Sequence, residues 1–317
     1  MEPDRVLEGP RVSIIMPCRD GLPFLSEALR SLQAQTYGNW ELLFVDGAST
    51  DGSVEAVLER LPEARILSAP DIPPPGAARN RAAEVAEGTL LAFLDSDDLW
   101  HPEKLERQVD FLTTSGADLV YSDCRVIDRD GRALGLYLSR HEPSRGRVFE
   151  ALLKSNFVPL PTILVTREFF ERSGGFSEIL RWAEDYDWLL RAARQGRYDY
   201  QAEPLADYRI TPGSLTEDFR ASYRENLEVL RDLGAAEADP SGQDRIEAAQ
   251  TSVLFRWAMR EALEGPRCWS DAMALAARAG RAAGLLVGLQ TLASVLRDGL
   301  RGFALRRRML KARKPRP

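Results

Sequence analysis

The sequence predicts an α/β protein in which a mixed, mainly parallel sheet is flanked by helices and followed by a helical C-terminal region. Three observations support this fold class. Short apolar runs alternate with segments of helical period through the first hundred residues. Clusters of Gly, Pro and Asp separate the two kinds of segment. From about Glu217 onward the pattern is helical only, so we expect one domain over 1–220 and a helical region over 221–317.

The first half of the chain is typical of repeated strand–helix units. Apolar runs predict strands at 12–16, 41–45, 65–68 and 89–94, and helical periodicity predicts helices at 22–32, 53–61 and 77–86. Strands that alternate with helices imply parallel βαβ units with right-handed crossovers.

Beyond the fourth predicted strand the regularity loosens, and we expect the sheet to become mixed. Further strands are expected at 119–127 and 161–166, and Arg129-Asp-Gly131 is typical of a turn. The helical region is interrupted by clusters of helix-breaking residues at 238–242 and 265–266.

The composition is that of an ordinary globular protein, with 44% hydrophobic and 28% charged side chains among 317 residues. Cys18, Cys124 and Cys268 lie far apart, which excludes a disulfide framework and a zinc knuckle and fits a reducing compartment. The first residues contain no apolar leader. The longest uncharged stretch, 282–296, is shorter than the roughly 20 residues that cross a bilayer. We therefore expect a cytoplasmic protein without a membrane span.

Charge is unevenly distributed along the chain. Residues 297–317 hold nine Lys or Arg and one Asp, whereas the other 296 residues hold 33 basic and 47 acidic side chains. An acidic body lacks the basic face that contacts with nucleic-acid phosphates need, so we expect no nucleic-acid partner.

Aspartates follow three of the predicted strands. Asp20 follows the first strand, Asp46 ends the second, and Asp95-Ser-Asp97-Asp98 ends the fourth. Ligands of open α/β sheets bind beyond the carboxyl ends of the strands, so these loops are expected to converge. In extended backbone Asp95 and Asp97 point the same way, and such a pair suits Mg²⁺ or Mn²⁺ shared with a nucleotide diphosphate. The alternative is a solvated acidic turn that caps the following helix.

A second acidic cluster lies in Arg181-Trp-Ala-Glu-Asp-Tyr-Asp-Trp188, at the start of a predicted helix. Glu184 and Asp185 are flanked by Trp182 and Trp188, whose bulk would desolvate a carboxylate and raise its pKa toward that of a general base. Acidic residues at a helix N-terminus are also favoured by the helix dipole alone. Both interpretations stay open at this point.

Several motifs follow one another along roughly residues 11 to 216. They are Val12–Pro17, Ser31–Tyr37, Trp40–Gly52, Gly76–Asn80, Leu91–Asp98, Gly174–Phe176 and Glu184-Asp185. In this order they resemble the inverting glycosyltransferase family 2, whose members have the GT-A, Rossmann-like fold of nucleotide-diphospho-sugar transferases. The resemblance implies an enzyme with that fold.

The resemblance also implies roles for individual residues. Asp185 matches the family's catalytic base, and Glu184 matches its usual catalytic neighbour. Asp95 and Asp97 resemble the metal-binding DxD pair, with Asp97 the direct ligand of Mn²⁺ or Mg²⁺ and Asp95 also close to the ribose. The implied nucleotide-binding residues are Pro17, Asp20, Asp46, Arg79, Asn80, Asp95 and Ser96.

An enzyme of this kind would transfer the sugar in one displacement. The metal would stabilise charge on the departing diphosphate while Asp185 takes the proton of the acceptor hydroxyl. The expected partners are a nucleotide-diphosphate sugar donor and a saccharide or lipid-linked saccharide acceptor. The expected role is in the biosynthesis of a surface glycan or glycoconjugate.

Three positions depart from the family's pattern. Gly47 replaces a second Asp after Asp46, which leaves the donor's nucleobase open, and Thr211 stands where a His is common. Val253 replaces the Gln of the processive QxxRW signature before Arg256-Trp257, so transfer of a single sugar is expected. An alternative stays open, namely a catalytically inactive nucleotide- or glycan-binding protein with the same fold.

Some residues have two interpretations. Arg79 and Asn80 approach the diphosphate or have a plain capping and solvation role, and Asp123 lines the acceptor cleft or lies in a turn or at the end of a strand ladder. Residues 285–317 combine a leucine stripe with a basic end. This pattern suits peripheral contact with the inner face of a membrane, or packing on the core or on a second subunit. The oligomeric state is left open by the sequence.

Overall fold

The computed structural model describes residues 9–71, 73–140, 142–211, 218–264 and 274. The chain divides into two compact units. The first extends to Thr211, and the second contains the remainder together with Leu153–Ser155. The expected division of roles, with catalysis in residues 1–220 and a helical region in 221–317, stays a prediction.

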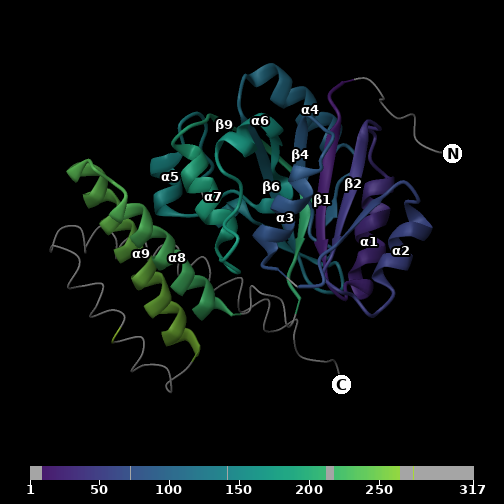
Figure 1. The fold of residues 1–317 in the computed structure, drawn as a ribbon. Coiled ribbons are helices and arrows are strands. Elements are labelled where there is room, and N and C mark those ends of the chain that lie inside the picture. Colours follow the sequence, from purple (N-terminus) through teal and green to yellow (C-terminus); the bar gives the residue numbers. More distant parts are fainter. Residues whose placement is uncertain (1–8, 72, 141, 212–217, 265–273, 275–317) are drawn as a thin grey trace. The chain divides into compact units, whose positions relative to one another are not determined.

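The first unit is built on a nine-stranded sheet (Figure 1). The strands are β1 (Val12–Cys18), β2 (Trp40–Asp46), β3 (Arg65–Ser68), β4 (Leu90–Phe93), β5 (Leu99–Trp100), β6 (Leu119–Ile127), β7 (Ala133–Leu136), β8 (Leu164–Thr166) and β9 (Tyr198–Arg209). Their order is β3-β2-β1-β4-β8-β6-β9-β5, and β7 pairs with β6. Strand β1 runs parallel to β2 and β4, whereas β8 runs antiparallel to β4 and β6. The predicted mixed sheet is therefore confirmed.

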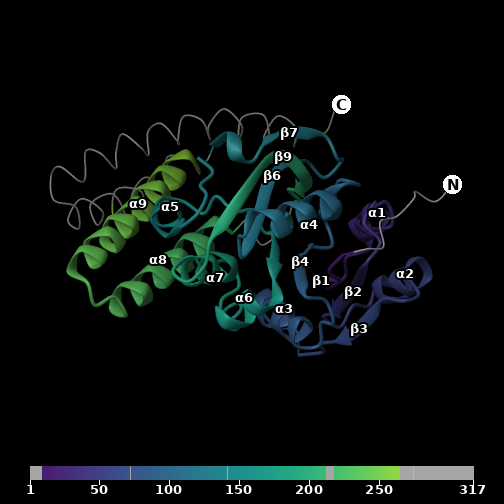
Figure 2. The same cartoon turned by 90° about the horizontal axis from the view of Figure 1, so that it is seen from above.

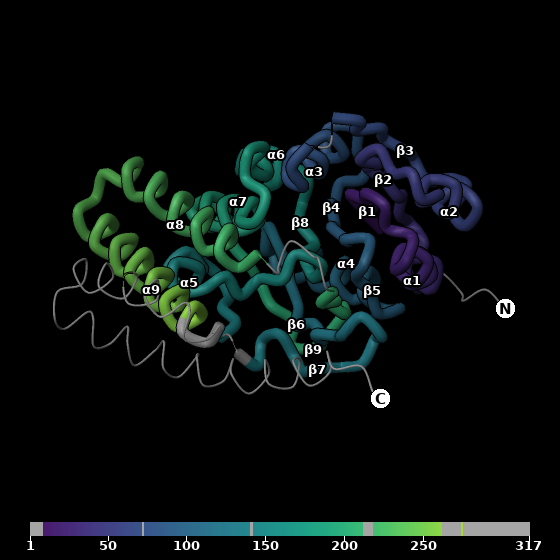
Figure 3. Tube along the Cα trace, turned by 90° about the horizontal axis from the view of Figure 1, so that it is seen from below, coloured from purple at the N-terminus to yellow at the C-terminus, as the bar shows by residue number. Residues whose placement is uncertain are grey.

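Helices cover both faces of this sheet. The helices up to Thr211 are α1 (Leu22–Gln33), α2 (Ser53–Arg60), α3 (Pro75–Glu84), α4 (Lys104–Ser115), α5 (Phe149–Lys154), α6 (Arg167–Arg172) and α7 (Glu184–Ala193), with 3₁₀ turns at Leu138–Arg140 and Leu160–Thr162. The last two residues of α5 belong to the second unit. Figure 2 shows α1 and α4 on one face and α3, α6 and α7 on the other, and Figure 3 shows these layers from below. The central parallel strands are thus buried from both sides, as such strands usually are.

The two faces of β1 illustrate how the sequence produces this arrangement. Val12, Ile14 and Met16 pack in one cluster with buried side chains of α1 and α4. Ile15 points to the opposite face, because side chains alternate along a strand, and it is equally buried. A strand buried on both faces is therefore a continuous apolar run in the sequence.

Some expected element bounds are wrong in detail. The strand expected over 161–166 is shortened to β8, because a 3₁₀ turn forms around Pro161, which has no N–H to donate to a sheet. Strand β9 is not predicted by the sequence, because its polar and Pro-containing run lacks an apolar pattern. Helix α3 begins at Pro75 instead of residue 77, since proline suits the first turn of a helix.

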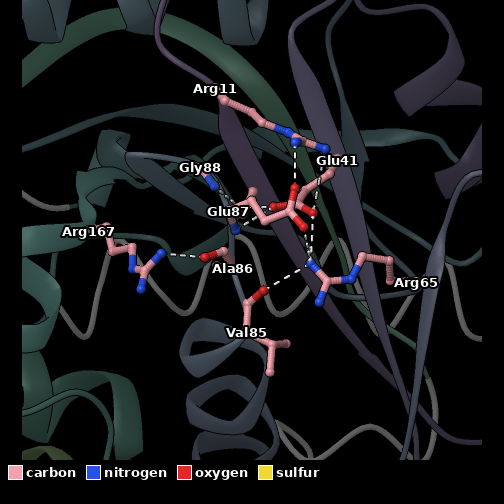
Figure 4. Close-up of polar contacts among 9 residues, drawn as sticks. Arg11, Glu41, Arg65, Val85, Ala86, Glu87, Gly88 and Arg167 are labelled. Carbon is pink, nitrogen blue, oxygen red and sulfur yellow. Dashed lines mark hydrogen bonds and ion pairs between the residues drawn. The ribbon is translucent and has the colours of Figure 1, made fainter.

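A polar network lies where β1 and β2 begin (Figure 4). The buried Glu41 carboxylate accepts hydrogen bonds from Ser13 Oγ at 2.5 Å and from Glu87 N at 2.7 Å. Arg65 Nη1 contacts the second Glu41 oxygen at 3.2 Å, and Arg11 pairs with Glu87 at 2.6 Å. We call these five residues the Glu41 network. It fixes the connection between α3 and β4 at the edge of the sheet opposite the carboxyl ends of β1 and β2.

In the second unit the described residues 218–264 form two helices, α8 (Phe219–Ala235) and α9 (Pro240–Glu264). The break between them overlaps the predicted breaker cluster at 238–242, although residues 240–242 already belong to the first turn of α9. Within the part of the chain that the structure describes, no helix is long and apolar enough to cross a membrane. The leucine stripe and basic end at 285–317 lie outside the described residues.

Candidate active site

The loops after β1, β2 and β4 leave the sheet at one edge. Cys18, at the end of β1, pairs with Asp46 at the end of β2. Leu94 N donates to the Ile15 carbonyl at 3.1 Å, so Asp95 leaves β4 directly beside β1. Asp46 and Asp95 therefore lie on either side of β1, at the edge where ligands of parallel sheets bind.

The loops after β1 and β2 are tied to each other by hydrogen bonds. Asp20 N donates to Ser49 Oγ at 3.0 Å, and Asp20 Oδ1 accepts from Thr50 N at 2.8 Å. Ser49 N in turn donates to Asp46 Oδ1 at 3.1 Å. Asp20 and Ala48 adopt positive φ angles of 51° and 61°, which are disfavoured for residues with a Cβ. These bonds hold both loops in one shape against that local strain.

Pro17 and Ser96, two more residues of the predicted nucleotide site, lie next to the same edge. Pro17 is part of β1 and pairs with Val45 of β2. The Ser96 hydroxyl hydrogen-bonds the Cys18 thiol, whose pKa is raised by burial. Direct contact of either residue with a nucleotide stays a prediction.

The aspartates that follow β4 differ in their surroundings. The Asp95 side chain is 34% exposed, whereas Asp98 is buried. Burial, together with the charge of Asp95, raises the pKa of Asp97 to about 6. Arg209 fixes this turn, because its N–H donates to Asp98 Oδ1 at 2.8 Å and its Nε donates to the Asp97 carbonyl at 2.7 Å. Three neighbouring carboxylates are thus held in one turn.

This acidic turn fits a divalent cation. Among the described residues, no group of three or more His, Cys, Asp and Glu side chains is arranged to hold a metal ion. Mg²⁺ and Mn²⁺ need fewer protein ligands, since they typically take one or two carboxylates and complete their shell with water and substrate phosphate. Burial, and then the charge of Asp95, raise the pKa of Asp97 and so disfavour its charged form, a cost that a bound cation would remove.

Glu184 and Asp185 open helix α7. Arg79 Nη1 donates to Glu184 Oε1 at 2.8 Å, and Arg79 Nη2 donates to Asp95 Oδ1 at 2.7 Å. One guanidinium therefore joins the acidic turn after β4 to the first turn of α7. Burial, together with the charge of Asp185, raises the pKa of Glu184 to about 7, although Arg79 opposes the rise.

Asp185 has different partners from Glu184. Its Oδ1 accepts from Tyr186 N at 2.6 Å, and Asn156 Nδ2 donates to its Oδ2 at 3.4 Å. Burial raises the pKa of Asp185, while these hydrogen bonds and the Arg79 charge limit the rise. A carboxylate with a raised pKa is chemically suited to take a proton from a hydroxyl.

An aromatic cluster positions α7 against the end of β4. Phe93, Phe170, Phe176 and Trp188 pack together with ring centroids 4.9 to 6.1 Å apart. Trp188 is fully buried, and its Nε1 donates to Ser173 Oγ at 2.9 Å. Trp188 thus anchors α7 in the core.

Helix α3 approaches the loop before α7 closely. A Cβ on Gly76 would lie 2.3 Å from the Ser177 carbonyl oxygen and 3.2 Å from Glu184 Cβ. Only glycine fits such a contact without movement of the backbone. Packing therefore explains the glycine at the start of the Gly76–Asn80 motif.

Asn80 holds the same loop through both ends of its amide group. Its Nδ2 donates to the Phe176 carbonyl at 2.9 Å, and its Oδ1 accepts from Phe176 N at 3.0 Å. Asn80 and Arg79 lie in the body of α3, whose N-cap residue is Pro74. The interpretation of both residues as helix caps is therefore wrong, while their contact with a nucleotide stays a prediction.

Asp123 is buried on β6, where its Oδ1 accepts from Cys124 N at 2.8 Å and from Leu138 N at 2.9 Å. These bonds support the interpretation of Asp123 as a structural residue. Sequence reasoning missed Arg209 and Asn156. Arg209 lies in a segment that the family resemblance already included, whereas no local pattern marks Asn156.

Comparison with known proteins gives the same family. The glycosyl transferase family 2 model matches residues 13–173. WfgD of Escherichia coli, a UDP-Glc:alpha-D-GlcNAc-diphosphoundecaprenol beta-1,3-glucosyltransferase, is 38% identical over 226 residues, which are 70% of this chain and 86% of WfgD. TuaG of Bacillus subtilis (strain 168), a putative teichuronic acid biosynthesis glycosyltransferase, is 27% identical over 232 residues, which are 71% of this chain and 88% of TuaG.

Solved structures share the fold at low sequence identity. S. aureus TarS 1–349 in complex with UDP-GlcNAc has a TM-score of 0.65 and 20% identity, and the match covers 96% of this chain and 93% of the TarS 1–349 chain. The mannosyltransferase PcManGT from Pyrobaculum calidifontis, in complex with GDP-Man and Mn²⁺, has a TM-score of 0.59 and 20% identity. This match covers 95% of this chain and 90% of the PcManGT chain. The chain belongs to glycosyl transferase family 2, and it is a glycosyltransferase of glycan biosynthesis with the GT-A fold.

Proposed function

We propose that the protein is a metal-dependent inverting glycosyltransferase that moves one sugar from a UDP-sugar to a hydroxyl of a lipid-linked saccharide. One observation carries this proposal. Arg79 joins Asp95 of the acidic turn to Glu184, the neighbour of Asp185, at the edge where the parallel strands end. A site for donor phosphates and a candidate general base are therefore adjacent.

The residues at this edge have complementary tasks in the reaction. A divalent cation held by Asp95 and Asp97 would supply the positive charge that a departing diphosphate needs. Asp185 accepts the proton of the acceptor hydroxyl. At the same time the hydroxyl oxygen forms a bond to the anomeric carbon of the donor sugar, and the bond from that carbon to the diphosphate breaks. Attack from the face opposite the diphosphate inverts the configuration in one displacement. Glu184 accepts a hydrogen bond from the cation Arg79, whereas Asp185 has no such ion pair within the described part of the chain, so we assign the role of base to Asp185.

The donor and acceptor classes are suggested by the similar proteins. The name of WfgD gives UDP-Glc as donor and a diphosphoundecaprenol-linked GlcNAc as acceptor, and TarS is solved with UDP-GlcNAc. We therefore propose a UDP-linked hexose and a lipid-linked saccharide for this chain. Such an acceptor lies at a membrane surface, where the basic, leucine-striped segment 285–317 would suit peripheral contact from the cytoplasmic side.

A screen of nucleotide sugars for thermal stabilisation, with Mn²⁺ and with EDTA, tests this proposal. Ligands that bind only the folded state raise the melting temperature by mass action. UDP-glucose or UDP-GlcNAc is expected to stabilise the protein in Mn²⁺ and to lose most of this effect in EDTA. Equal stabilisation in EDTA would contradict the metal dependence, and stabilisation by GDP-sugars alone would contradict the donor.

A second assay measures release of UDP from the best stabilising donor. Release above the rate of the uncatalysed reaction is expected of the enzyme. Stabilisation without release of UDP, in the presence of a lipid-linked acceptor, would instead favour nucleotide binding without transfer.

A further inference from the structure

Arg79 is a buried cation in the middle of the candidate active site. Its side chain is 4% exposed, against 34% for Asp95 and 9% for Glu184. Its guanidinium carbon lies 5.6 Å from the centroid of the Phe176 ring. Each terminal nitrogen is hydrogen-bonded to one carboxylate, and Nε has no hydrogen-bond partner among the described residues.

This burial distinguishes Arg79 from an arginine that binds phosphate at a surface. Of the three linked side chains, only Asp95 offers a large exposed area to a nucleotide in solution. Burial disfavours the charged guanidinium, but the charges of Asp95 and Glu184 outweigh this and raise the pKa of Arg79. Arg79 is therefore a permanent positive charge whose two terminal nitrogens are each already hydrogen-bonded to a protein carboxylate.

We propose that Arg79 is a positioning residue, a guanidinium bridge that sets the separation between Asp95 and the first turn of α7. The inference rests on the proposed function, because that function gives Asp95 the donor's metal and Asp185 the acceptor's proton. The bridge holds these two parts of the reaction site as one rigid unit. Glu184 is then the anchor of the bridge on α7.

The rest of α3 supports the same role. Gly76 lets the helix contact the Ser177 carbonyl, and Asn80 binds the Phe176 backbone. Together with Arg79, three residues of α3 therefore hold α7 and the segment that leads into it. A displacement of about 1 Å at a reacting group costs about 100-fold in rate. Loss of the bridge should therefore lower turnover without a matching loss of nucleotide affinity.

The test compares Arg79→Lys with Arg81→Lys in the full chain. Arg81 lies on the same helix, is 44% exposed and forms a two-bond pair with Asp71, so it is a control with the same chemical change. UDP binding is measured without metal by ligand-observed NMR, which also detects weak affinity. Turnover is measured as UDP released from UDP-glucose in the presence of Mn²⁺ and a lipid-linked saccharide acceptor.

A single ammonium group keeps the charge but lacks the two-pronged geometry that spans both carboxylates. Arg79→Lys is expected to lose about 100-fold in turnover and to keep UDP affinity within about threefold, whereas Arg81→Lys matches the wild type in both. Wild-type turnover in Arg79→Lys would overturn the bridge, because charge alone would then suffice. Equal losses of UDP affinity and turnover would overturn it in favour of direct contact with the diphosphate.

A second pair of variants decides the question if Arg79→Lys does not fold. Glu184→Gln keeps an acceptor oxygen for Arg79 Nη1, whereas Glu184→Ala removes it. The bridge predicts at least about tenfold more turnover in the Gln variant than in the Ala variant, at equal UDP affinity. Equal turnover in the two variants would contradict the bridge, since Glu184 would then contribute only its charge or its ability to take a proton.

Failure of the proposed function has a different signature. A wild-type chain that neither binds UDP nor releases it from any nucleotide sugar would overturn that function, and the bridge with it. If the wild type binds UDP and releases it from a nucleotide sugar, and Arg79→Lys has the same UDP affinity and turnover, only the bridge is overturned.

Discussion

Asp185 and Glu184 are adjacent in the sequence, but different groups face their carboxylates. Glu184 Oε1 contacts a cation, Arg79 Nη1, at 2.8 Å. The hydrogen bonds that Asp185 accepts come from neutral groups, Tyr186 N and Asn156 Nδ2. The charge of Asp185 raises the pKa of Glu184, so the two carboxylates titrate as a pair that keeps its last proton to higher pH. The chemistry of the site depends on the pH at which the pair loses this proton.

Turnover is expected to rise with pH through about 7, the value to which burial raises the pKa of Glu184. A general base works only when it is deprotonated, so a pair that retains a proton at lower pH is less active there. The measurement is kcat for UDP release from about pH 5 to about pH 9 at saturating donor. A flat profile across neutral pH would contradict the assignment of this pair to proton transfer.

Lys104 is a buried lysine of α4. Its Nζ lies 3.9 Å from the centroid of the Trp100 ring and 3.4 Å from the Ile163 carbonyl oxygen. Burial lowers the pKa of Lys104 well below its usual value. Because the amine is charged in the unfolded chain, its burial costs stability below the unfolded-state pKa, and the cost shrinks as pH rises toward that pKa.

Lys104→Met is therefore expected to stabilise the protein by about 1–3 kcal/mol at neutral pH, because Met keeps the apolar stem and removes the amine. Urea unfolding at neutral pH and at about pH 9.5 measures the gain, which should be smaller at the higher pH. Lys154→Met, at an exposed lysine, is the control and should change little. A loss of stability in Lys104→Met at both pH values would show that the amine is needed where it lies.

At the scale of elements, α3 is the support of the candidate active site. Gly76→Ala is expected to destabilise the protein by roughly 2 kcal/mol or more, since the new Cβ would lie 2.3 Å from the Ser177 carbonyl oxygen. Turnover of the folded variant should fall more than its UDP affinity. Gly234→Ala in α8 is the control, since its nearest neighbour, Ile246 Cγ2, is 3.3 Å away. Equal stability of the two variants would contradict the close approach.

The Glu41 network stabilises elements away from the site. Burial disfavours the Glu41 charge, but hydrogen bonds from Ser13, the Glu87 backbone and Arg65 outweigh it and lower the pKa of Glu41. A lowered pKa contributes stability above the unfolded-state pKa, and this is lost as pH falls through the folded-state value. Glu41→Gln should therefore cost about 1–2 kcal/mol at neutral pH and less near pH 3, as measured by chemical denaturation. An equal cost at both pH values would show that the charge of Glu41 contributes nothing to stability.

The elements also show what a sequence can predict. The strands expected at 65–68 and 119–127 match β3 and β6 in their bounds, because a short apolar run marks each of them. β6 is almost entirely buried, whereas β3 is only partly buried. Strand β9 has no such run, and its position depends on pairing with β6, which is a long-range contact. The acidic motifs are visible locally, but the bond from Arg79 to Glu184 joins residues 105 apart, a distance that no local pattern encodes.

At the scale of the whole molecule, all proposed site residues belong to the first unit, which ends at Thr211. Donor chemistry therefore needs, in this account, only the sheet and the helices on its two faces. The second unit and the basic segment 297–317 are left for tasks that the donor site does not perform. We propose that the segment 285–317 helps to deliver a lipid-linked acceptor, since its basic residues and leucine stripe suit contact with a membrane surface.

The most direct test is UDP release from a UDP-sugar, with a lipid-linked acceptor, by the wild type and by Asp185→Asn. The wild type should release UDP in the presence of Mn²⁺, and this release should stop when EDTA removes the metal. Asp185→Asn should bind UDP with Mn²⁺ as the wild type does and lose about 10²- to 10⁴-fold in turnover, because the amide cannot take the proton. Wild-type turnover in the variant, or undiminished release in EDTA, would contradict metal-assisted transfer with Asp185 as the base.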